Sequence, residues 1–371
     1  MNTVAVALGS RSYEILVGYE ILSSLGSIVQ GVSPSKKHFF IVDEKVQETH
    51  AQIAVQSFEE DSACAEPFGI DAVESNKVMP TVEAIWSSML RDGCDRGTNC
   101  IAIGGGLAGD IGGFAAASFM RGVPFVQVPT TLLAMVDASI GGKTGVNVPL
   151  PTADGGSVLG KNLAGAFWQP KVVVADVATL GTLDNRQFRC GLAECVKHAM
   201  LGNDGMLQLL LEQVDAIFAR DAGVLVELVT MSAQIKADVV AADEREAGCR
   251  ALLNLGHTFA HAIEPIPELR LFHGEAVSIG LVAAVACAEA CGLVDGVRGD
   301  LLRSLLVSLG LPTRLPMPVH IDRLLDVMRV DKKAIDSSIR LVLPTENGAD
   351  VVENVDDSAI ALAWTSVGAI L

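Results

Sequence analysis

Residues 101–114 read IAIGGGLAGDIGGF, and this stretch decides the fold of the N-terminal half of the chain. An apolar run of strand type leads into three consecutive glycines, and a helix-like segment follows. Bare backbone amides at such a turn, together with the N-terminus of the next helix, can cradle a pyrophosphate. The spacing is not the GxGxxG of the common dinucleotide fold, and glycine-rich turns also serve packing. Taken alone, the stretch leaves both roles open.

Strand-like runs alternate with helix-like segments throughout the first half of the chain. Further runs rich in β-branched and aromatic residues are KHFFIVD at 37–43, VPFVQVPTT at 123–131 and KVVVAD at 171–176. Strands bounded by glycine and separated by helices are typical of a mostly parallel sheet covered by helices. We therefore expect residues 1–180 to form an α/β domain that binds a nucleotide.

The second half of the chain has a different character. Long stretches carry helical apolar spacing, as in GLAECVKHAMLG at 191–202 and HGEAVSIGLVAAVACAEACG at 273–292. We expect residues 181–371 to form a mainly α-helical domain, in which IRLVLP at 339–344 is a short closing strand. At 371 residues the chain is longer than most single-core domains, which agrees with two domains.

Composition excludes several classes of partner. The formal net charge of −17 disfavours attraction to nucleic acid or to anionic membranes, because both are negatively charged. The apolar run at 277–294 contains Ser278, Glu289 and two glycines, so it predicts a buried helix rather than a membrane span. The N-terminus lacks the basic start and apolar core of a signal peptide. Eight scattered cysteines without a paired framework indicate reduced thiols, and we expect a cytoplasmic protein.

The segment PTADGGSVL at 151–159 interrupts otherwise compact sequence. Its Pro, Gly, Asp and Ser residues are typical of turns. We expect a surface loop or insertion, which costs little conformational entropy.

Polar side chains crowd the segment VPTTLLAMVDASIGGKTGVN at 128–147. A crowded polar loop without function is one interpretation. Because loops positioned by a sheet concentrate binding groups, a ligand loop beside the Gly141–Gly142 turn is favoured. The candidate side chains are Thr130, Thr131, Asp137, Lys143 and Asn147.

Three of the seven histidines fall within seventeen residues. His257 and His261 are four residues apart and so share a helix face, and His273 follows in LFHGEAV. A lone histidine is more often a core residue than a ligand. Three histidines with an available carboxylate fit a catalytic zinc-type site, which needs three nitrogen or oxygen ligands and an open position. Spacing leaves the three histidines equivalent and does not identify the carboxylate.

Two charged groups also have an ordinary interpretation. Glu194 and Lys197 are three residues apart on one helix face, which is typical of a surface salt bridge. A second group reads as a charged helix face and loop, but beside a metal it could hold a phosphate and a carboxylate. Its members are Lys236, Glu246, Arg250 and Asn254.

At this point the chain resembles a known family, the 3-dehydroquinate synthases of the shikimate pathway. The resemblance covers nearly the whole chain and is densest from residue 101 to 280. Its carriers include GGGLAGDIGGF, MRGVPFVQVPTTLLAMVDASIGGKTGVN, LGKNLAGAFWQP, GLAECVKH, DEREAGCRALLNLGHTFAHAIE, HGEAV and DKK. The resemblance implies an N-terminal α/β NAD-binding domain, a helical domain that binds metal and substrate, and a site in the cleft between them.

The resemblance also assigns residues. The metal ligands would be Glu194, His257 and His273, which makes Glu194 and Lys197 active-site neighbours rather than a salt bridge. The NAD contacts would be Asp43, Glu74, Lys77, Gly105, Gly106, Asp110, Thr130, Thr131, Thr179 and Thr182, with Asp137 and Lys143 shared between cofactor and substrate. The substrate contacts would be Lys161, Asn162, Lys197, Lys236, Arg250, Asn254, His261 and one of Lys332 and Lys333. Arg121 would reach the phosphate in a neighbouring subunit, which implies a homodimer.

The implied reaction converts 3-deoxy-D-arabino-heptulosonate 7-phosphate into 3-dehydroquinate and phosphate. It uses catalytic NAD and a divalent metal, zinc first and cobalt as the alternative. His261 and Glu246 are the candidates for proton handling, and Lys197 and Lys143 are the further catalytic candidates. The first rivals are related sugar-phosphate cyclases, which Arg250, Asn254 and His261 disfavour. The second is a metal-dependent polyol dehydrogenase, which needs no such concentration of lysines.

Overall fold

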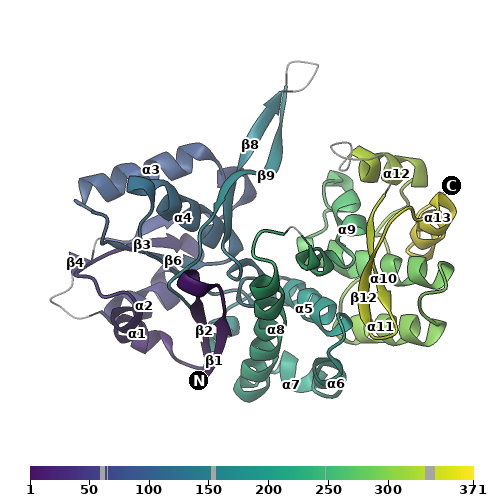
Figure 1. Ribbon diagram of the computed structural model, residues 1–371, viewed down its shortest axis with the longest axis horizontal. Helices are drawn as coiled ribbons and strands as arrows, with labels where there is room; N and C mark the ends of the chain where they lie inside the picture. Colours follow the sequence, from purple (N-terminus) through teal and green to yellow (C-terminus); the bar gives the residue numbers. More distant parts are fainter. Residues whose placement is uncertain (59–62, 65, 152–155, 247, 331–338) are drawn as a thin grey trace. The chain divides into compact units, whose positions relative to one another are not determined.

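A computed structural model of the chain describes residues 1–58, 63–64, 66–151, 156–246, 248–330 and 339–371 (Figure 1). The chain divides into two compact units. The first comprises Met1–Leu183 and Ala222–Arg245, and the second comprises Asp184–Asp221 and Glu246–Leu371. A single boundary at residue 180 therefore does not describe the chain, since one later helix belongs to the first unit. Periodicity identifies a helix, but it does not say against which sheet the helix packs.

The first unit is built on an eight-stranded sheet. The strand order is β1-β2-β10-β7-β6-β3-β4, and β5 also pairs with β3. Only β1 and β2 pair antiparallel, and the other pairs are parallel. The strands are β1 (Asn2–Val6), β2 (Tyr13–Gly18), β3 (Lys37–Asp43), β4 (Ala63–Cys64), β5 (Phe68–Ile70), β6 (Asn99–Gly104), β7 (Phe125–Pro129) and β10 (Val172–Asp176).

Helices cover both faces of this sheet. Alternate residues of β3 point to opposite faces: Phe39 and Ile41 pack with α3 (Met79–Arg91) and α4 (Gly106–Ser118), and Phe40 and Val42 pack with α1 (Leu25–Val32) and α2 (Gln52–Gln56). Burial on both faces explains why the strand reads as a continuous apolar run. The long helix α8 (Ala222–Ala242) packs on β1 and β2.

The predicted surface loop at 151–159 is wrong in part. Strands β8 (Lys143–Pro151) and β9 (Ser157–Phe167) form an antiparallel hairpin, so Pro151 and residues 157–159 belong to strands (Figure 1). The residue composition of this segment is typical of a turn. Its backbone groups are nevertheless satisfied by pairing between the two strands, which composition does not reveal. The register shifts between Val146 and Val148, and this irregularity sets Asn147 apart from the ladder.

The second unit is mainly helical, and α10 (His273–Ala290) is its core element. This helix packs against α5 (Asn185–Met200), α9 (His257–Ile263), α11 (Gly296–Ser308), α13 (Asp357–Ser366) and β11 (Leu341–Thr345). Of its 18 residues, 78% are buried. It is the one described helix long and apolar enough to cross a membrane, and the burial within the unit accounts for that composition. The predicted closing strand is β11, but β12 and a last helix follow it.

The elements of the second unit are α5 (Asn185–Met200), α6 (Asp204–Glu212), α7 (Val214–Phe218), α9 (His257–Ile263), α10, α11 (Gly296–Ser308), α12 (Ile321–Val330), β11 (Leu341–Thr345), β12 (Gly348–Val352) and α13 (Asp357–Ser366).

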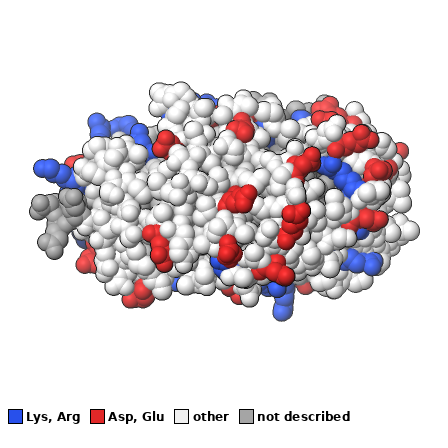
Figure 2. Space-filling model, turned by 90° about the horizontal axis from the view of Figure 1, so that it is seen from below, with Lys and Arg blue, Asp and Glu red and all other residues white. Residues whose placement is uncertain are grey.

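Acidic side chains are spread over the face shown in Figure 2, with basic side chains between them. This distribution fits the net charge of −17 and offers no continuous basic surface on that face. A bound phosphate must therefore meet local lysines or arginines.

Candidate active site

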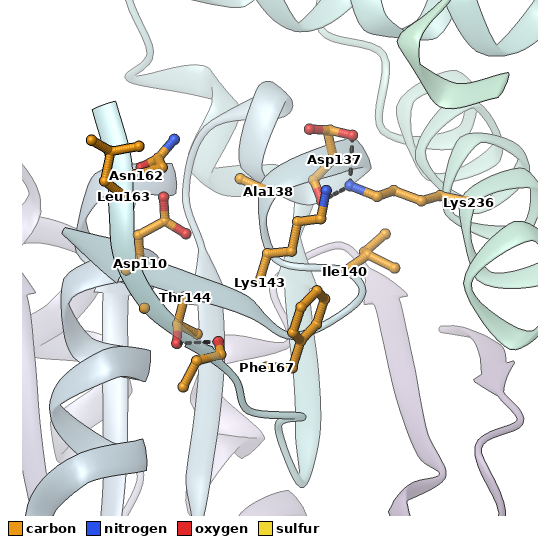
Figure 3. A pocket seen from close by; sticks show the side chains of 13 residues that line it. Asp110, Asp137, Ala138, Ile140, Lys143, Thr144, Asn162, Leu163, Phe167 and Lys236 are labelled. Atoms are coloured by element: carbon orange, nitrogen blue, oxygen red, sulfur yellow. Dashed lines mark hydrogen bonds and ion pairs between the residues drawn. The ribbon is translucent and has the colours of Figure 1, made fainter. Parts of the chain in front are cut away.

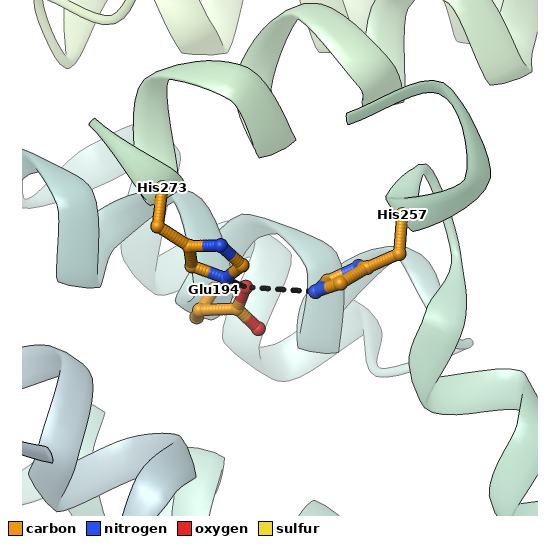
Figure 4. Close-up of side chains that lie close together, drawn as sticks. All are labelled: Glu194, His257 and His273. Atoms are coloured by element: carbon orange, nitrogen blue, oxygen red, sulfur yellow. Dashed lines mark ion pairs between the residues drawn. The ribbon is translucent and has the colours of Figure 1, made fainter. Parts of the chain in front are cut away.

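Three side chains from separate helices of the second unit converge on one point (Figure 4). Glu194 lies on α5, His257 begins α9 and His273 begins α10. The Nε2 atoms of His257 and His273 lie 3.5 Å and 3.6 Å from Glu194 Oε1. One potential ligand atom from each residue falls within 4.8 Å of the other two. The donor set of two imidazoles and one carboxylate is the type that catalytic zinc sites use.

Second contacts orient both imidazoles. The Nδ1 atom of His257 lies 3.2 Å from the Leu255 carbonyl oxygen, and Nδ1 of His273 lies 3.2 Å from Glu264 Oε2. Both acceptors favour a proton on Nδ1, so each ring turns its Nε2 atom toward Glu194. Orientation of this kind is the usual support of metal-binding histidines.

The backbone before α9 explains the position of His257. Gly256 adopts a left-handed conformation with φ of 76°, and a Cβ atom there would lie 2.9 Å from the backbone nitrogen of Leu281. Only glycine permits both the turn and the close approach to α10.

The electrostatics of the cluster favour a cation. Burial would raise the pKa of Glu194, but Lys197, His257 and His273 outweigh it and hold that pKa well below its usual range. Burial and the charge of Lys197 lower the pKa of His257 to about 3. Burial acts to lower the pKa of His273 too, but Glu194 and Glu264 outweigh it and raise the pKa to about 10. The carboxylates thus hold a proton at His273 that a metal ion can replace.

The burial of the Glu194 carboxylate supports the fit of a metal ion. Both of its carboxylate oxygens are fully buried. Such atoms need a compensating charge. Lys197 provides part of it, since its ammonium group pairs with Glu194 Oε2, so the expectation that the two are only neighbours is wrong for this structure. A side chain three residues along the same helix is ideally placed for such contact.

Further predicted residues belong to the second unit, and one of them, His261, lies beside this cluster. The ring of His261 stands perpendicular to that of His257, with centroids 5.5 Å apart. Arg250 and Asn254 lie in the short helical turn Cys249–Asn254, where Arg250 is almost fully buried. The Asn254 amide donates to Glu246 Oε1 over 3.3 Å.

In the first unit, predicted NAD residues follow the carboxyl ends of neighbouring strands. Asp43 ends β3, the glycines Gly105 and Gly106 join β6 to α4, and Thr130 and Thr131 follow β7. Thr179 and Thr182 follow β10, where the Thr182 hydroxyl donates to the Thr179 carbonyl oxygen over 3.1 Å. Carboxyl ends of parallel strands meet at one edge of a sheet, which is the usual ligand-binding edge of α/β folds.

A polar network joins the start of α4 to the hairpin. Lys77 Nζ lies 2.5 Å from Asp110 Oδ2 and also donates to Asn162 Oδ1. Asn147 donates to Glu74 Oε1 over 2.7 Å and accepts from the Asn162 backbone over 2.9 Å. Burial raises the pKa of Asp110, although Lys77 opposes the shift. The network therefore brings predicted NAD residues and the predicted substrate residue Asn162 together.

A pocket of 570 Å³ lies next to this network (Figure 3). Lys143 and Lys236 point into it beside Asp137, and Lys236 Nζ lies 2.6 Å from Asp137 Oδ1. The pocket is also lined by Asp110 and Asn162. Two ammonium groups and two carboxylates therefore line one hollow of the first unit.

Other predicted residues are not brought into these groups. Lys161 is exposed on β9 and does not line the pocket. Arg121 is exposed in the turn Phe119–Arg121, with a positive φ of 69°. Lys332 and Lys333 lie outside the described residues.

One supporting residue is missed by reasoning from the sequence, and the contacts of another are not predicted. Asn147 is a candidate of the ligand loop, but only the structure shows that it links Glu74 to Asn162. Glu264 ends the motif LGHTFAHAIE, and its acidic side chain within a histidine-rich motif is the signal that could have found it.

Comparison with known proteins identifies related sequences over both halves of the chain. Residues 68–190 match the family model described as 3-dehydroquinate synthase N-terminal, and residues 191–334 match 3-dehydroquinate synthase C-terminal. A relative named 3-dehydroquinate synthase from Symbiobacterium thermophilum is 41% identical over 96% of this chain and 98% of its own length.

Solved structures share the fold. A 2-epi-5-epi-valiolone synthase from Streptomyces hygroscopicus subsp. jinggangensis, with NAD+ and Zn2+ bound, aligns with a TM-score of 0.84 at 26% identity over 97% of this chain and 98% of its own. A 2-deoxy-scyllo-inosose synthase complexed with carbaglucose-6-phosphate, NAD+ and Co2+ aligns with a TM-score of 0.84 at 24% identity over 98% and 99%, which shows the fold alone. With both halves matched by family models and a relative alike over nearly its entire length, the chain belongs to the 3-dehydroquinate synthase family of enzymes.

Proposed function

We propose that the chain converts 3-deoxy-D-arabino-heptulosonate 7-phosphate into 3-dehydroquinate and inorganic phosphate. Family membership supports this reaction. The observation that carries it is the convergence of Glu194, His257 and His273, in which two oriented imidazoles face a buried carboxylate. This arrangement suits a divalent cation that a secondary alcohol can approach from the open position.

In the proposed centre, Glu194, His257 and His273 would hold zinc, with cobalt as an alternative, because these are the metals bound by the related structures. When bound, the metal supplies a positive charge that polarises a substrate hydroxyl. Glu264 and the Leu255 carbonyl oxygen hold the two imidazoles in the tautomer that presents Nε2. Lys197 adds a second positive charge at Glu194.

NAD is the proposed cofactor of the first unit, in agreement with the NAD+ bound in the related valiolone synthase. When bound, it supplies a hydride acceptor that is regenerated within the turnover. The Gly105–Gly106 turn at the start of α4 is suited to the pyrophosphate, because it has no side chain to block the backbone amides. The threonines after β7 and β10 would contact the rest of the cofactor.

Lys143 and Lys236 are the proposed phosphate-binding groups. They project into the same pocket, and Asp137 holds Lys236 in place through a 2.6 Å ion pair. Arg250 and Asn254 would bind the substrate carboxylate, since a guanidinium and an amide both donate hydrogen bonds to an acid. His261 and Glu246 are the proposed proton carriers, and Lys197 would assist by charge stabilisation.

Two alternatives are less well supported. A related sugar-phosphate cyclase has the same fold, but the relative at 41% identity is named 3-dehydroquinate synthase, and Arg250 and Asn254 provide for an acid. A polyol dehydrogenase acts on a neutral substrate, which does not need the two lysines that line the pocket. A homodimer in which Arg121 reaches the neighbouring site is also proposed. A cytoplasmic location is proposed too, and it is supported by eight cysteines that form no disulfide within the described residues.

The test is to supply purified protein with NAD, a divalent metal and the heptulosonate phosphate. We expect inorganic phosphate and a carbocyclic acid to form without net accumulation of NADH. Stoichiometric NADH would favour the dehydrogenase. Turnover of neutral heptulose or hexose phosphates in preference to the acid would favour the other cyclases.

A further inference from the structure

We infer that Arg186, acting through Glu275, positions His273 relative to Glu194 and thereby sets the metal affinity of the centre. Arg186 is not one of the three ligand candidates and pairs with Glu275 instead, so the role inferred for it is that of a positioning residue. The inference rests on the proposed role of Glu194, His257 and His273 as metal ligands. Four observations within the second unit carry it.

First, Arg186 and Glu194 belong to the same face of α5. Arg186, Cys190 and Glu194 follow one another at intervals of four residues, so they are stacked along the helix. A contact made by this face is therefore transmitted to Glu194 through a rigid element. α5 is continuous from Asn185 to Met200, and its side chains from Cys190 to Met200 are all buried.

Second, α10 touches this face at its very start. A Cβ atom on Gly274 would lie 2.3 Å from Cys190 Cα and 2.4 Å from its carbonyl oxygen. The backbones of α5 and α10 therefore approach as closely as glycine allows, directly after the ligand candidate His273. The spacing of the two ligand-bearing helices is set at this contact.

Third, Arg186 contacts the segment 270–275 at several points. Its Nε and Nη2 atoms each lie 2.7 Å from one carboxylate oxygen of Glu275, and Nη2 also donates to the Arg270 carbonyl oxygen over 2.8 Å. Its guanidinium lies 3.8 Å from the centre of the Phe272 ring. His273 lies inside the segment that these contacts hold.

Fourth, Glu275 connects the ion pair to the helix terminus. Its Oε2 atom accepts from the Phe272 backbone nitrogen over 2.8 Å, which caps α10 immediately before His273. The same oxygen accepts from Arg186 Nη2. One carboxylate thus fixes the first turn of α10 and ties it to α5.

Removal of an ordinary surface ion pair and removal of a pair that positions a metal ligand should affect metal binding differently. Exposed pairs contribute little to folding stability. Removing an outer partner that orients a metal ligand typically weakens metal binding about ten- to a hundredfold. The test therefore measures metal affinity directly, with Zn2+ or Co2+ as the probe, in competition with a chelator.

Arg186→Met should weaken Co2+ and Zn2+ binding by roughly ten- to a hundredfold and alter the visible absorption spectrum of bound Co2+. Glu275→Gln retains an oxygen that can accept from the Phe272 backbone nitrogen but loses the charged pair with Arg186. Its metal affinity should therefore lie between that of Arg186→Met and that of the wild type. The matched control is Arg329→Met. Arg329 has the same 46% side-chain exposure and a 2.6 Å pair, but its partner is Asp357 on α13 rather than a residue of segment 270–275. It should keep wild-type affinity.

The outcomes separate the inference from the proposed function. Wild-type affinity and an unchanged Co2+ spectrum in Arg186→Met would overturn the positioning role, while metal binding by the wild type would leave the proposed centre intact. Failure of the wild type itself to bind the metals would overturn the proposed centre. Should Arg186→Met fold poorly, Glu275→Gln decides by the same two measurements, because its cap is retained.

Discussion

His273 Nδ1 lies 3.2 Å from Glu264 Oε2, and its Nε2 lies 3.6 Å from Glu194 Oε1. The imidazole is thus held between two carboxylates, one outside the proposed metal position and one within it. Glu264→Gln keeps an acceptor for Nδ1 but removes the negative charge that supports the ring. We expect metal affinity to fall about tenfold, measured by chelator competition. Affinity equal to that of the wild type would contradict an orienting role for Glu264.

His257→Ala should abolish both metal binding and turnover, because it removes one of three ligand candidates. His320→Ala is the control, since His320 is exposed and bonds to the chain terminus. Metal content and phosphate release are the measurements. Full activity in His257→Ala would refute the ligand assignment.

Lys77→Met should destabilise the first unit. It would leave the Asp110 carboxylate without its 2.5 Å partner, and breaking a buried pair on one side costs about 3 kcal/mol. Urea unfolding of the metal-free protein measures the change. The double variant with Asp110→Asn should recover part of the loss, because no uncompensated charge remains; recovery of none would point to packing of the lysine chain instead.

Acidification should weaken the fold through His38. This histidine is buried, and burial lowers its pKa although the Ser35 backbone opposes the shift. His38 takes up a proton near pH 6.5 in the unfolded chain but only at lower pH in the folded chain. Its contribution to the free energy of unfolding is therefore complete above about pH 6.5, and it declines as the pH falls toward the pKa of the folded state. The urea midpoint should drop between pH 7 and 5.

His38→Gln should make that drop shallower, and His320→Gln, which changes an exposed residue, should leave it as in the wild type. A profile in His38→Gln as steep as in the wild type would assign the acid sensitivity to other groups.

Local pattern was sufficient for much of the fold. The run KHFFIVD coincides with β3, and the strand, glycine turn and helix expected at 101–114 are β6 and α4. Such elements are predictable because their apolar residues repeat with the period of the element itself. The α/β first half and the mainly helical second half are confirmed for the same reason.

The sequence by itself determined most of the element types, the family and the residue types of the site. Only the tertiary structure decided that α8 joins the first unit, that residues 157–159 extend a hairpin, and that Glu194 meets His257 and His273. His257, His261 and His273 are equivalent by spacing, and Glu194 lies 63 residues before the first of them. The packing of α5, α9 and α10 selects among them, because contacts between helices depend on their faces and crossing points, and no local repeat in the chain encodes these.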